Sequence, residues 1–235
     1  GKLFDPAKAE EALQDGTLDE VVLAHQMLAD SFWPKKVEAG HLDDIRPCIG
    51  CNECLLSGFS GKHYYCAVNP ECYAERDYRL PAPTGQKRFV LVIGGGPGGM
   101  EAAIAAADRG YKVTLWEKSS RLGGNLWAAG GPSFKHDVLR LIGYMRTQVL
   151  KKGVEVVLCK DATADEIVAF GADKVILAAG AHSIVPAIEG VEGAKLSDAI
   201  LLGKTKAQGH VVVIGGGLVG CETACMAVET AEDVT

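Results

Sequence analysis

Hydrophobic residues in the later part of the chain fall into short runs separated by glycine-rich loops and helical patterns. Strands are predicted over residues 89–93, 112–116, 174–178 and 210–214, and an Ala-rich helix runs from about residue 98 to 109. Strands that alternate with helices are typical of a parallel sheet. We therefore expect an α/β protein.

The first residues form a separate pattern. A short helix is predicted over residues 6–15, because Pro6 suits a first helical turn and Gly16 suits a helix end. A brief strand over residues 20–23 and a second helix from about Ala24 follow. This fragment is too small to bury a core of its own, so we expect most of its domain to lie upstream.

The two ends of the sequence do not look like natural termini. The first residue is Gly1 rather than Met, and no secretory leader follows it. Residues 232–235 begin a strand and stop inside it. We therefore expect the chain to be an internal piece of a longer polypeptide.

The composition mainly excludes classes of function. The 235 residues are 48% hydrophobic and 23% charged, the balance of an ordinary globular protein. A net charge of −6 gives no attraction to nucleic acid or to an anionic membrane. No apolar run approaches the roughly 20 residues of a membrane helix. We expect a cytoplasmic protein that binds neither nucleic acid nor a membrane.

A glycine loop follows the first predicted strand of the later part and opens the Ala-rich helix. Its spacing is G-x-G-x-x-G, which in this context binds the pyrophosphate of a dinucleotide. The first glycine permits the turn, the second lets the backbone approach the phosphates, and the third lets helix and strand pack closely. The helix start then offers free N–H groups to the phosphates. The candidate residues are Gly94, Gly96, Pro97, Gly98 and Gly99.

An acidic residue, Glu117, lies 23 residues after Gly94, at the end of the next predicted strand. A carboxylate there accepts hydrogen bonds from ribose hydroxyls and repels a 2′-phosphate. The alternative is an exposed glutamate at a strand end. With its neighbour Lys118 it is a candidate for binding FAD. Residues 121–126, which begin with Arg121, are expected to form a second loop over the same ligand.

The fingerprint occurs a second time, at Gly215, Gly217 and Gly220, so that GGGPGGME in the first loop is echoed by GGGLVGCE. Two such Rossmann-like units imply that a nicotinamide dinucleotide, NAD(P)H, meets a flavin head to head. The alternative is a degenerate duplicate that binds nothing. The residue that separates NAD from NADP would stand at position 238, beyond the sequence.

Four cysteines lie close together as C-x2-C-x2-C-x11-C, namely Cys48, Cys51, Cys54 and Cys66. The first three resemble the ligand run of a ferredoxin-type 4Fe–4S cluster. A zinc site is the main alternative, although zinc usually takes two separated C-x2-C pairs. Cys72 is a rival fourth ligand.

Disulfides are not expected beside two nucleotide folds in a cytosolic enzyme. The remaining cysteines, Cys159, Cys221 and Cys225, are expected to be small buried hydrophobic residues. An iron–sulfur cluster carries one electron at a time, whereas a nicotinamide delivers two as hydride. FAD can accept the pair and release single electrons, so it is expected between them.

The run DDIRPCIGCNEC at residues 43–54, followed by CAVNP at residues 66–70 and then by the first fingerprint, resembles the old yellow enzyme-like iron–sulfur flavoproteins. Members include 2,4-dienoyl-CoA reductase, 2-enoate reductase, trimethylamine dehydrogenase and bile-acid enoyl oxidoreductases. The resemblance covers essentially the whole chain.

The resemblance implies an N-terminal (β/α)8 barrel (TIM barrel) that holds FMN and whose last portion is residues 1–46. Gly1 would approach the FMN phosphate, and Ala24 and His25 stand where the family has Gly-Arg at that phosphate. His25 brings less charge than arginine at neutral pH. Read without the family, it is simply a histidine at a helix start.

The other implied regions are a 4Fe–4S segment (47–80), a linker (81–88), the first part of an FAD-binding domain (89–208) and the start of an NAD(P)-binding domain (209–235). The family's catalytic acid and base come from earlier barrel strands, so no catalytic residue is named in this chain. The implied FAD contacts are Glu117, Arg121, Gly124, Asn125, Ala179 and Gly180.

The implied activity is NAD(P)H-dependent reduction of an activated C=C bond in an enoate or enoyl-CoA. Electrons would pass from NAD(P)H to FAD, the 4Fe–4S cluster, FMN and substrate. One alternative is an amine dehydrogenase like trimethylamine dehydrogenase, in which the second fingerprint has decayed. Another is a stand-alone electron-transfer module.

Overall fold

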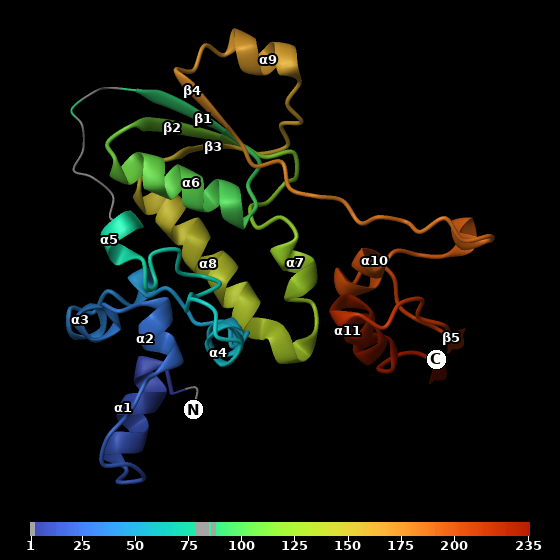
Figure 1. Ribbon diagram of the computed structural model, residues 1–235, viewed down its shortest axis with the longest axis horizontal. Helices are drawn as coiled ribbons and strands as arrows, with labels where there is room; N and C mark the ends of the chain where they lie inside the picture. The colour runs from blue at the N-terminus through green and yellow to red at the C-terminus, as the bar shows by residue number, and fades with distance from the viewer. Residues whose placement is uncertain (1–2, 79–84, 86–87) are drawn as a thin grey trace.

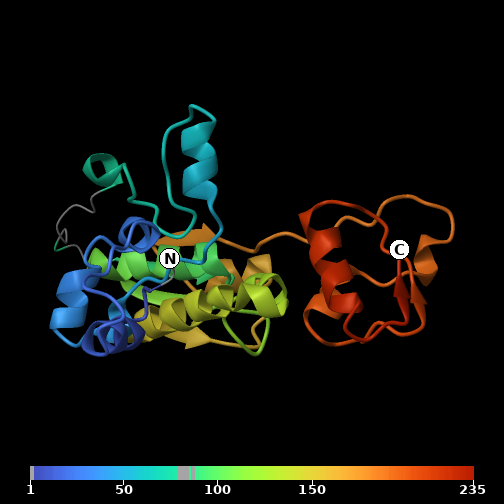
Figure 2. The same ribbon diagram turned by 90° about the horizontal axis from the view of Figure 1, so that it is seen from below.

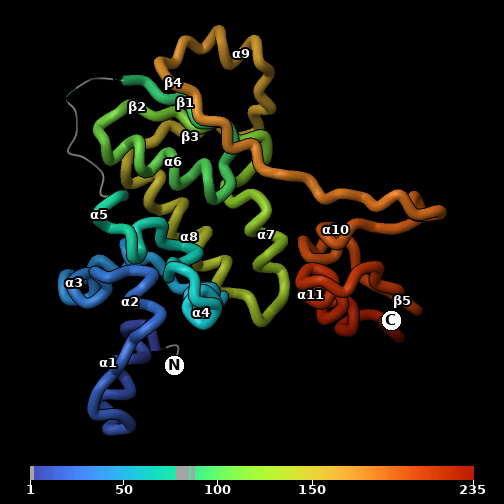
Figure 3. The backbone as a smooth tube through the Cα atoms, viewed as in Figure 1, coloured from blue at the N-terminus to red at the C-terminus, as the bar shows by residue number. Residues whose placement is uncertain are grey.

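The computed structural model describes residues 3–78, 85 and 88–235. It has a larger body, which holds the N-terminal helices, the cysteine segment and a four-stranded sheet (Figure 1). A smaller C-terminal unit holds a two-stranded sheet. The tube in Figure 3 shows that an extended segment between β4 and α10 joins the two.

The main sheet is parallel, with the strand order β3-β2-β1-β4. The strands are β1 (Phe89–Ile93), β2 (Lys112–Trp116), β3 (Glu155–Val157) and β4 (Lys174–Leu177). The chain leaves β1 toward β2 on one side and later returns to β4 on the other, so the order reverses at β1. The predicted α/β class and the first two strands are confirmed, and the strand expected at 174–178 ends one residue earlier.

Two helices, α6 (Pro97–Asp108) and α8 (His136–Lys151), pack against each other and form the core with the sheet. Val92, Met100, Leu115 and Val149 are fully buried between them. The sequence analysis did not single out α8. Its signal was present, however, because its buried residues repeat at helical spacing: Val138, Leu141, Ile142, Met145 and Val149.

Shorter elements complete the larger body and lead to the smaller one. In Figure 1, α9 lies beyond the sheet, away from α6 and α8. After α9, Phe170 packs its ring edge-on against Trp116 at a centroid distance of 4.8 Å. These elements are α7 (Leu126–Ala129), η2 (Ser133–Lys135), α9 (Ala164–Ala169), η3 (Val191–Gly193) and α10 (Ser197–Leu201).

The N-terminal helix α1 (Pro6–Gln14) is capped by the Asp5 side chain, and Gly16 follows it with φ +72°. The predicted helix 6–15 is thus one residue shorter. The strand expected over 20–23 is wrong, because every described strand belongs to the two later sheets and none pairs with this segment. The next elements are α2 (His25–Ala29), α3 (Trp33–Glu38), η1 (Leu42–Asp44), α4 (Glu53–Phe59) and α5 (Glu75–Tyr78).

The smaller unit contains β5 (His210–Val211), α11 (Leu218–Ala227) and β6 (Asp233–Val234). The two strands are parallel and pair at only two positions each. The strand predicted over 210–214 is therefore much shorter in the structure, since its pairing partner provides only two positions. Within the described ranges, no helix combines the length and apolarity that crossing a membrane requires.

The start of α6 depends on a very close backbone contact. Gly94 ends β1 with φ +105°, and the chain re-enters along α6 so that Gly99 comes back over it. A Cβ added to Gly99 would lie 1.8 Å from the carbonyl oxygen of Gly94. Only glycine fits there, as the third position of the fingerprint predicted.

Replacing Gly99 by alanine is expected to lower the free energy of unfolding by about 1–3 kcal/mol, the usual cost of overpacking. The matched control is Gly143→Ala in α8, where an added Cβ meets nothing within 4 Å. That change is expected to stabilise the helix by about 0.5–1 kcal/mol. Urea unfolding measures both, and a similar effect of the two substitutions would contradict the close contact.

Candidate dinucleotide and cysteine sites

The first glycine loop lies at the point where the strand order reverses, the usual ligand crevice of an open parallel sheet. A Cβ on Gly94 would lie 2.2 Å from the carbonyl oxygen of Ala178, just after β4, so the loop is wedged against that strand. On its other side the loop is open, because a Cβ on Gly96 would meet nothing within 4 Å. The backbone around Gly96 is therefore accessible to a phosphate.

Glu117 is buried at the end of β2 and its carboxylate faces the loop. One oxygen accepts the N–H of Gly95 at 2.5 Å, and the other accepts the N–H of Ser119 at 2.7 Å. Burial alone would raise the pKa of Glu117, but the hydrogen bonds from Ser119 and Gly95 outweigh it and hold the pKa below its usual value. The group is thus a fixed, charged acceptor beside the glycine loop.

The predicted second loop covers the first. The N–H of Gly123 donates to the carbonyl oxygen of Gly95 at 2.8 Å. Gly124 has φ +52°, and a Cβ on it would lie 2.9 Å from the Cα of Gly96. Arg121 places its guanidinium over the Trp127 ring, 4.0 Å from the ring centroid.

The remaining predicted FAD residues surround the same loop. Asn125 donates its side-chain amide to the carbonyl oxygen of Ala181 at 3.3 Å, which ties the covering loop to the segment after β4. In that segment, the Cα of Ala179 would lie 3.3 Å from a Cβ on Gly94, and Gly180 has φ +76°. Lys118 is exposed beside Glu117. The structure therefore gathers all of these residues around one loop.

The four predicted cysteines line a single hollow: Cys48, Cys51, Cys54 and Cys66. Burial raises the pKa of the Cys48 thiol, and the nearby Cys66, Cys51 and Cys54 raise it further. Within the described parts of the chain, no three His, Cys, Asp or Glu side chains are grouped as ligands of a single metal ion.

The local sequence explains how the first three cysteines reach this hollow. Gly50 has φ +65° and Asn52 has φ +58°, a left-handed conformation that glycine and asparagine tolerate best. These two residues turn the chain on either side of Cys51. Asn52 is also the N-cap residue of α4, and Cys54 lies in the first turn of that helix.

A residue that the sequence analysis missed fixes the segment around Pro47, just before the first cysteine. The buried side chain of Gln26 donates to the carbonyl oxygen of Arg46 at 2.8 Å and accepts the N–H of Cys48 at 3.0 Å. Its amide thus pairs with the backbone on both sides of Pro47, which has no N–H to donate. No sequence signal marked it, because a lone buried glutamine has no motif.

Cys72 is buried and does not line the hollow, although burial and the nearby Cys66 raise the pKa of its thiol to about 11. This placement favours Cys66 as the fourth member of the group. The expectation that Cys159, Cys221 and Cys225 are buried is wrong, since all three are exposed. Cys159 lies in a loop after β3, and the other two lie on α11, which has few buried residues.

The residues predicted at an FMN phosphate lie next to the cysteine hollow. Ala24 and His25 line a second hollow of about 320 Å³, and His25 lines both. Cys48 and Asn52 also line both, so they form part of the wall between them. Gly1 lies outside the described residues, as does most of the predicted linker.

The second glycine loop repeats the first in its backbone. Gly215 has φ +114°, and Gly217 is the N-cap residue of α11 with the same extended backbone that Gly96 has before α6. A Cβ on Gly220 would lie 1.8 Å from the carbonyl oxygen of Gly215. The predicted residues therefore form a second cradle of the same shape.

Residues 88–235 match the family model described as pyridine nucleotide-disulphide oxidoreductase. Cinnamate reductase of Clostridium sporogenes is 39% identical over 238 aligned positions, which take in 100% of this chain and 35% of the relative. A solved structure of 2-naphthoyl-CoA reductase in complex with 2-naphthoyl-CoA matches 97% of the chain and 35% of its own, at 33% identity and a TM-score of 0.89.

The solved structure of histamine dehydrogenase from Rhizobium sp. 4-9 matches 100% of the chain and 37% of its own, at 28% identity and a TM-score of 0.86. The chain thus spans only a little over a third of the length of these relatives. Their names span both reductases and amine dehydrogenases, so the predicted resemblance to the old yellow enzyme-like flavoproteins is confirmed. With both glycine cradles inside the matched range, the chain belongs to the pyridine nucleotide-disulphide oxidoreductase family.

Proposed function

We propose that this chain is the electron-entry part of a larger NAD(P)H-dependent enzyme that reduces an activated C=C bond in an enoate or enoyl-CoA. The observation that carries the proposal is the combination, in one chain, of two dinucleotide cradles and a hollow lined by four cysteines. When bound, the cofactors would relay electrons from NAD(P)H through FAD and a 4Fe–4S cluster to FMN.

FAD is proposed at the first cradle. The open side at Gly96 and the start of α6 offer backbone N–H groups to the pyrophosphate. Glu117 would receive the ribose hydroxyls, since each of its oxygens has a lone pair left beyond the bond that it already accepts. Arg121, Gly124 and Asn125 would cover the ligand. NAD(P)H is proposed at the second cradle.

A 4Fe–4S cluster is proposed in the cysteine hollow. A cluster of four irons holds its thiolates further apart than a single ion does. The four thiols line one hollow, and the first three have the C-x2-C-x2-C spacing of a ferredoxin-type ligand run rather than the two separated pairs that zinc usually takes. The partial burial of Cys48 would also shield the cluster from water on one side.

The region before the cysteines is proposed to complete an FMN site. The hollow lined by Ala24 and His25 shares a wall with the cysteine hollow, which is the arrangement that electron passage between the two would require. Residues 1–46 would then be the end of a barrel, followed by a cluster segment (47–80), a linker (81–88), an FAD-binding part (89–208) and the start of an NAD(P)-binding part (209–235).

The amine dehydrogenase alternative is favoured by the likeness to histamine dehydrogenase. Against it, the second cradle keeps all three glycines and the close contact between Gly220 and Gly215. A stand-alone module is disfavoured because relatives that align with the whole chain are nearly three times its length. The reductase names among the relatives agree with this choice.

The decisive experiment uses the full-length protein, purified without oxygen, and quantifies iron, sulfide, FMN and FAD before adding NADH or NADPH. We expect about four irons and one of each flavin per chain, bleaching of the flavin by a nicotinamide, and turnover with a 2-enoate such as cinnamate. Turnover of an amine with no bleaching by NAD(P)H would support the alternative. A colourless, metal-free protein would overturn both.

Glu117→Gln is expected to lower the free energy of unfolding at pH 7 by about 1–3 kcal/mol, because an amide offers one acceptor oxygen where Gly95 and Ser119 need two. The FAD content of the full-length protein should fall with it. The control is Glu189→Gln at an exposed site.

The effect of Glu117 is also expected to depend on pH. Because its pKa is lower in the folded protein, its stabilisation is complete above the unfolded value of about 4.3 and is lost as the pH falls through the folded value. Urea unfolding at pH 7 and pH 3 should therefore show a wild-type advantage over Glu117→Gln that shrinks in acid. A constant advantage would contradict the role of the charge.

Cys66→Ala is expected to abolish iron binding in the full-length protein, while Cys72→Ala retains it, because only Cys66 lines the hollow. Cys51→Ala should leave FAD reducible by NAD(P)H but stop electrons from reaching FMN. The control is Cys159→Ala at an exposed site, which should keep its iron. Iron and sulfide assays and anaerobic spectra measure these effects. If Cys72→Ala lost its iron and Cys66→Ala kept it, the fourth ligand would be Cys72 and not Cys66.

A further inference from the structure

The two glycine fingerprints share one more residue that the cradles do not use. Each continues to a glutamate five positions after its middle glycine: Glu101 in α6 and Glu222 in α11. Both make an ion pair with a basic residue from another part of the chain. Glu101 pairs with Arg46, and Glu222 pairs with Lys135. Equivalent glutamates thus fasten each unit to a different neighbour.

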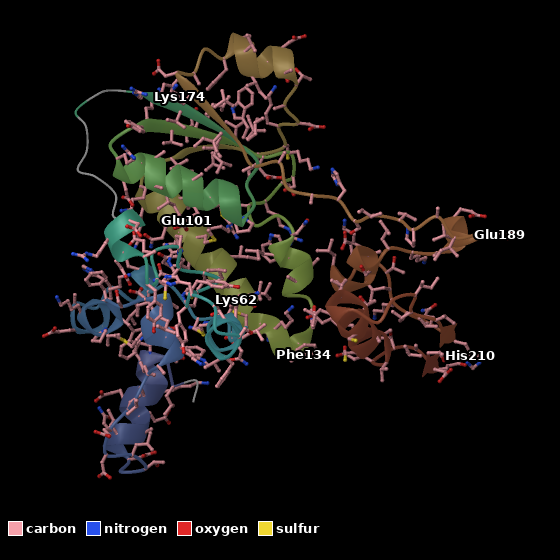
Figure 4. The ribbon with its side chains drawn as sticks, in the orientation of Figure 1. Lys62, Glu101, Phe134, Lys174, Glu189 and His210 are labelled. Carbon is pink, nitrogen blue, oxygen red and sulfur yellow. The ribbon has the colours of Figure 1, made fainter. Side chains whose placement is uncertain are left out.

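The Arg46–Glu101 pair has two parallel hydrogen bonds, of 2.9 and 3.1 Å, between the guanidinium and the carboxylate. The same guanidinium donates to the carbonyl oxygen of Val68 at 2.6 Å and lies 5.2 Å from the Tyr144 ring centroid. The Arg46 side chain is only 15% exposed, so water screens the pair weakly. In Figure 4, Glu101 lies at the edge of α6 that faces the N-terminal half of the chain.

Arg46 therefore connects three segments that matter for the cysteine hollow. Its own backbone lies two residues before Cys48, and Val68 lies two residues after Cys66. Its carboxylate partner lies on the helix that opens the first dinucleotide cradle. One side chain thus holds the segments that carry the first and the last of the four cysteines against that helix.

The backbone of Arg46 is held as well. Its N–H donates to the buried carboxylate of Asp30 at 2.8 Å, and its carbonyl oxygen accepts from Gln26 at 2.8 Å. Asp30 is in turn paired with Lys36 at 2.6 Å. The Arg46 backbone is consequently fixed in place, and its guanidinium ties the cysteine segment to α6.

We propose that Glu101 and Arg46 are positioning residues that set the separation between the first dinucleotide cradle and the cysteine hollow. This inference rests on the proposed function, in which single electrons cross that separation. Electron transfer slows steeply as the distance grows. Loosening the Arg46–Glu101 pair would therefore slow electron transfer from the flavin to the cluster, while the hydride step at the flavin continues. Neither residue lines the cysteine hollow.

The obvious alternative is that the pair only adds stability. Apolar packing already joins the segment to the core through Val68, with Ile49 beside it. A separate ion pair, Lys152–Asp108 at 2.5 Å, is made by the other end of α6. Removing a purely structural pair would lower the free energy of unfolding, as removing Lys152–Asp108 would, but it would not slow electron passage from the flavin to the cluster.

The test compares Glu101→Gln with Glu222→Gln in the full-length protein. Both changes remove the same charge from equivalent positions, but only the first loosens the cysteine segment. Glutamine keeps one acceptor and turns an N–H donor toward the guanidinium. Arg46→Lys provides an independent variant that keeps the charge and loses the two-pronged bond. Asp108→Asn controls for loss of an ion pair from α6.

Two readouts are measured. Hydrogen exchange of residues 46–68 should quicken by about tenfold in Glu101→Gln and Arg46→Lys and stay within about twofold of wild type in the two controls. In stopped-flow mixing with NADH, the flavin should bleach at the wild-type rate in Glu101→Gln, while the iron–sulfur absorbance should change about tenfold more slowly.

The outcomes separate the two claims. Iron present in the wild type, with unchanged exchange and unchanged electron crossing in both Glu101→Gln and Arg46→Lys, would overturn the positioning role alone. The same slowing in Asp108→Asn would also overturn it. A wild-type protein without iron would overturn the proposed function and, with it, the positioning role of the Arg46–Glu101 pair.

Discussion

The architecture depends on backbone contacting backbone where a side chain is missing. Because Gly99 has no Cβ, α6 can start directly above the turn at Gly94, beside the end of β1. That contact fixes where Glu117 and the covering loop must lie, since both bond to Gly95 within the same turn. A larger side chain at position 99 would displace helix, turn and cover together.

The cysteine segment is attached to this framework mainly through polar groups. In Figure 2, α4 and the loops on either side of it extend away from the body that holds the sheet. What holds the segment at its base is a set of side chains with fixed partners: Gln26, Asp30, Arg46 and Glu101. Directional bonds of this kind specify one placement, whereas apolar packing tolerates small slides.

The sequence predicted those parts of the site whose chemistry depends on short spacing. The glycines of both cradles, Glu117 after the second strand and the cysteine run from Cys48 to Cys54 all lie where local rules place them. Turn-forming residues such as Gly50 and Asn52 set the backbone of only one or two positions, so their effect can also be predicted from the sequence.

What the sequence could not provide were contacts between distant segments. Gln26 pairs with residue 46 and Arg46 with Glu101, across 20 and 55 positions, and no local pattern announces either. The same limit explains the errors. The 20–23 segment has the composition of a strand, but no described strand pairs with it. Cys221 and Cys225 were expected on a buried face of their helix, but in the small second unit both stay exposed.

The two cradles share a backbone but not the residues inside it, since Pro97 and Gly98 in one correspond to Leu218 and Val219 in the other. The shape is therefore carried by the glycines that both loops keep, and the two positions before the last of them differ between the copies. Such a duplicated scaffold can diverge in evolution: one copy can change its preference for a nucleotide through side chains outside the turn, while the other keeps its original ligand.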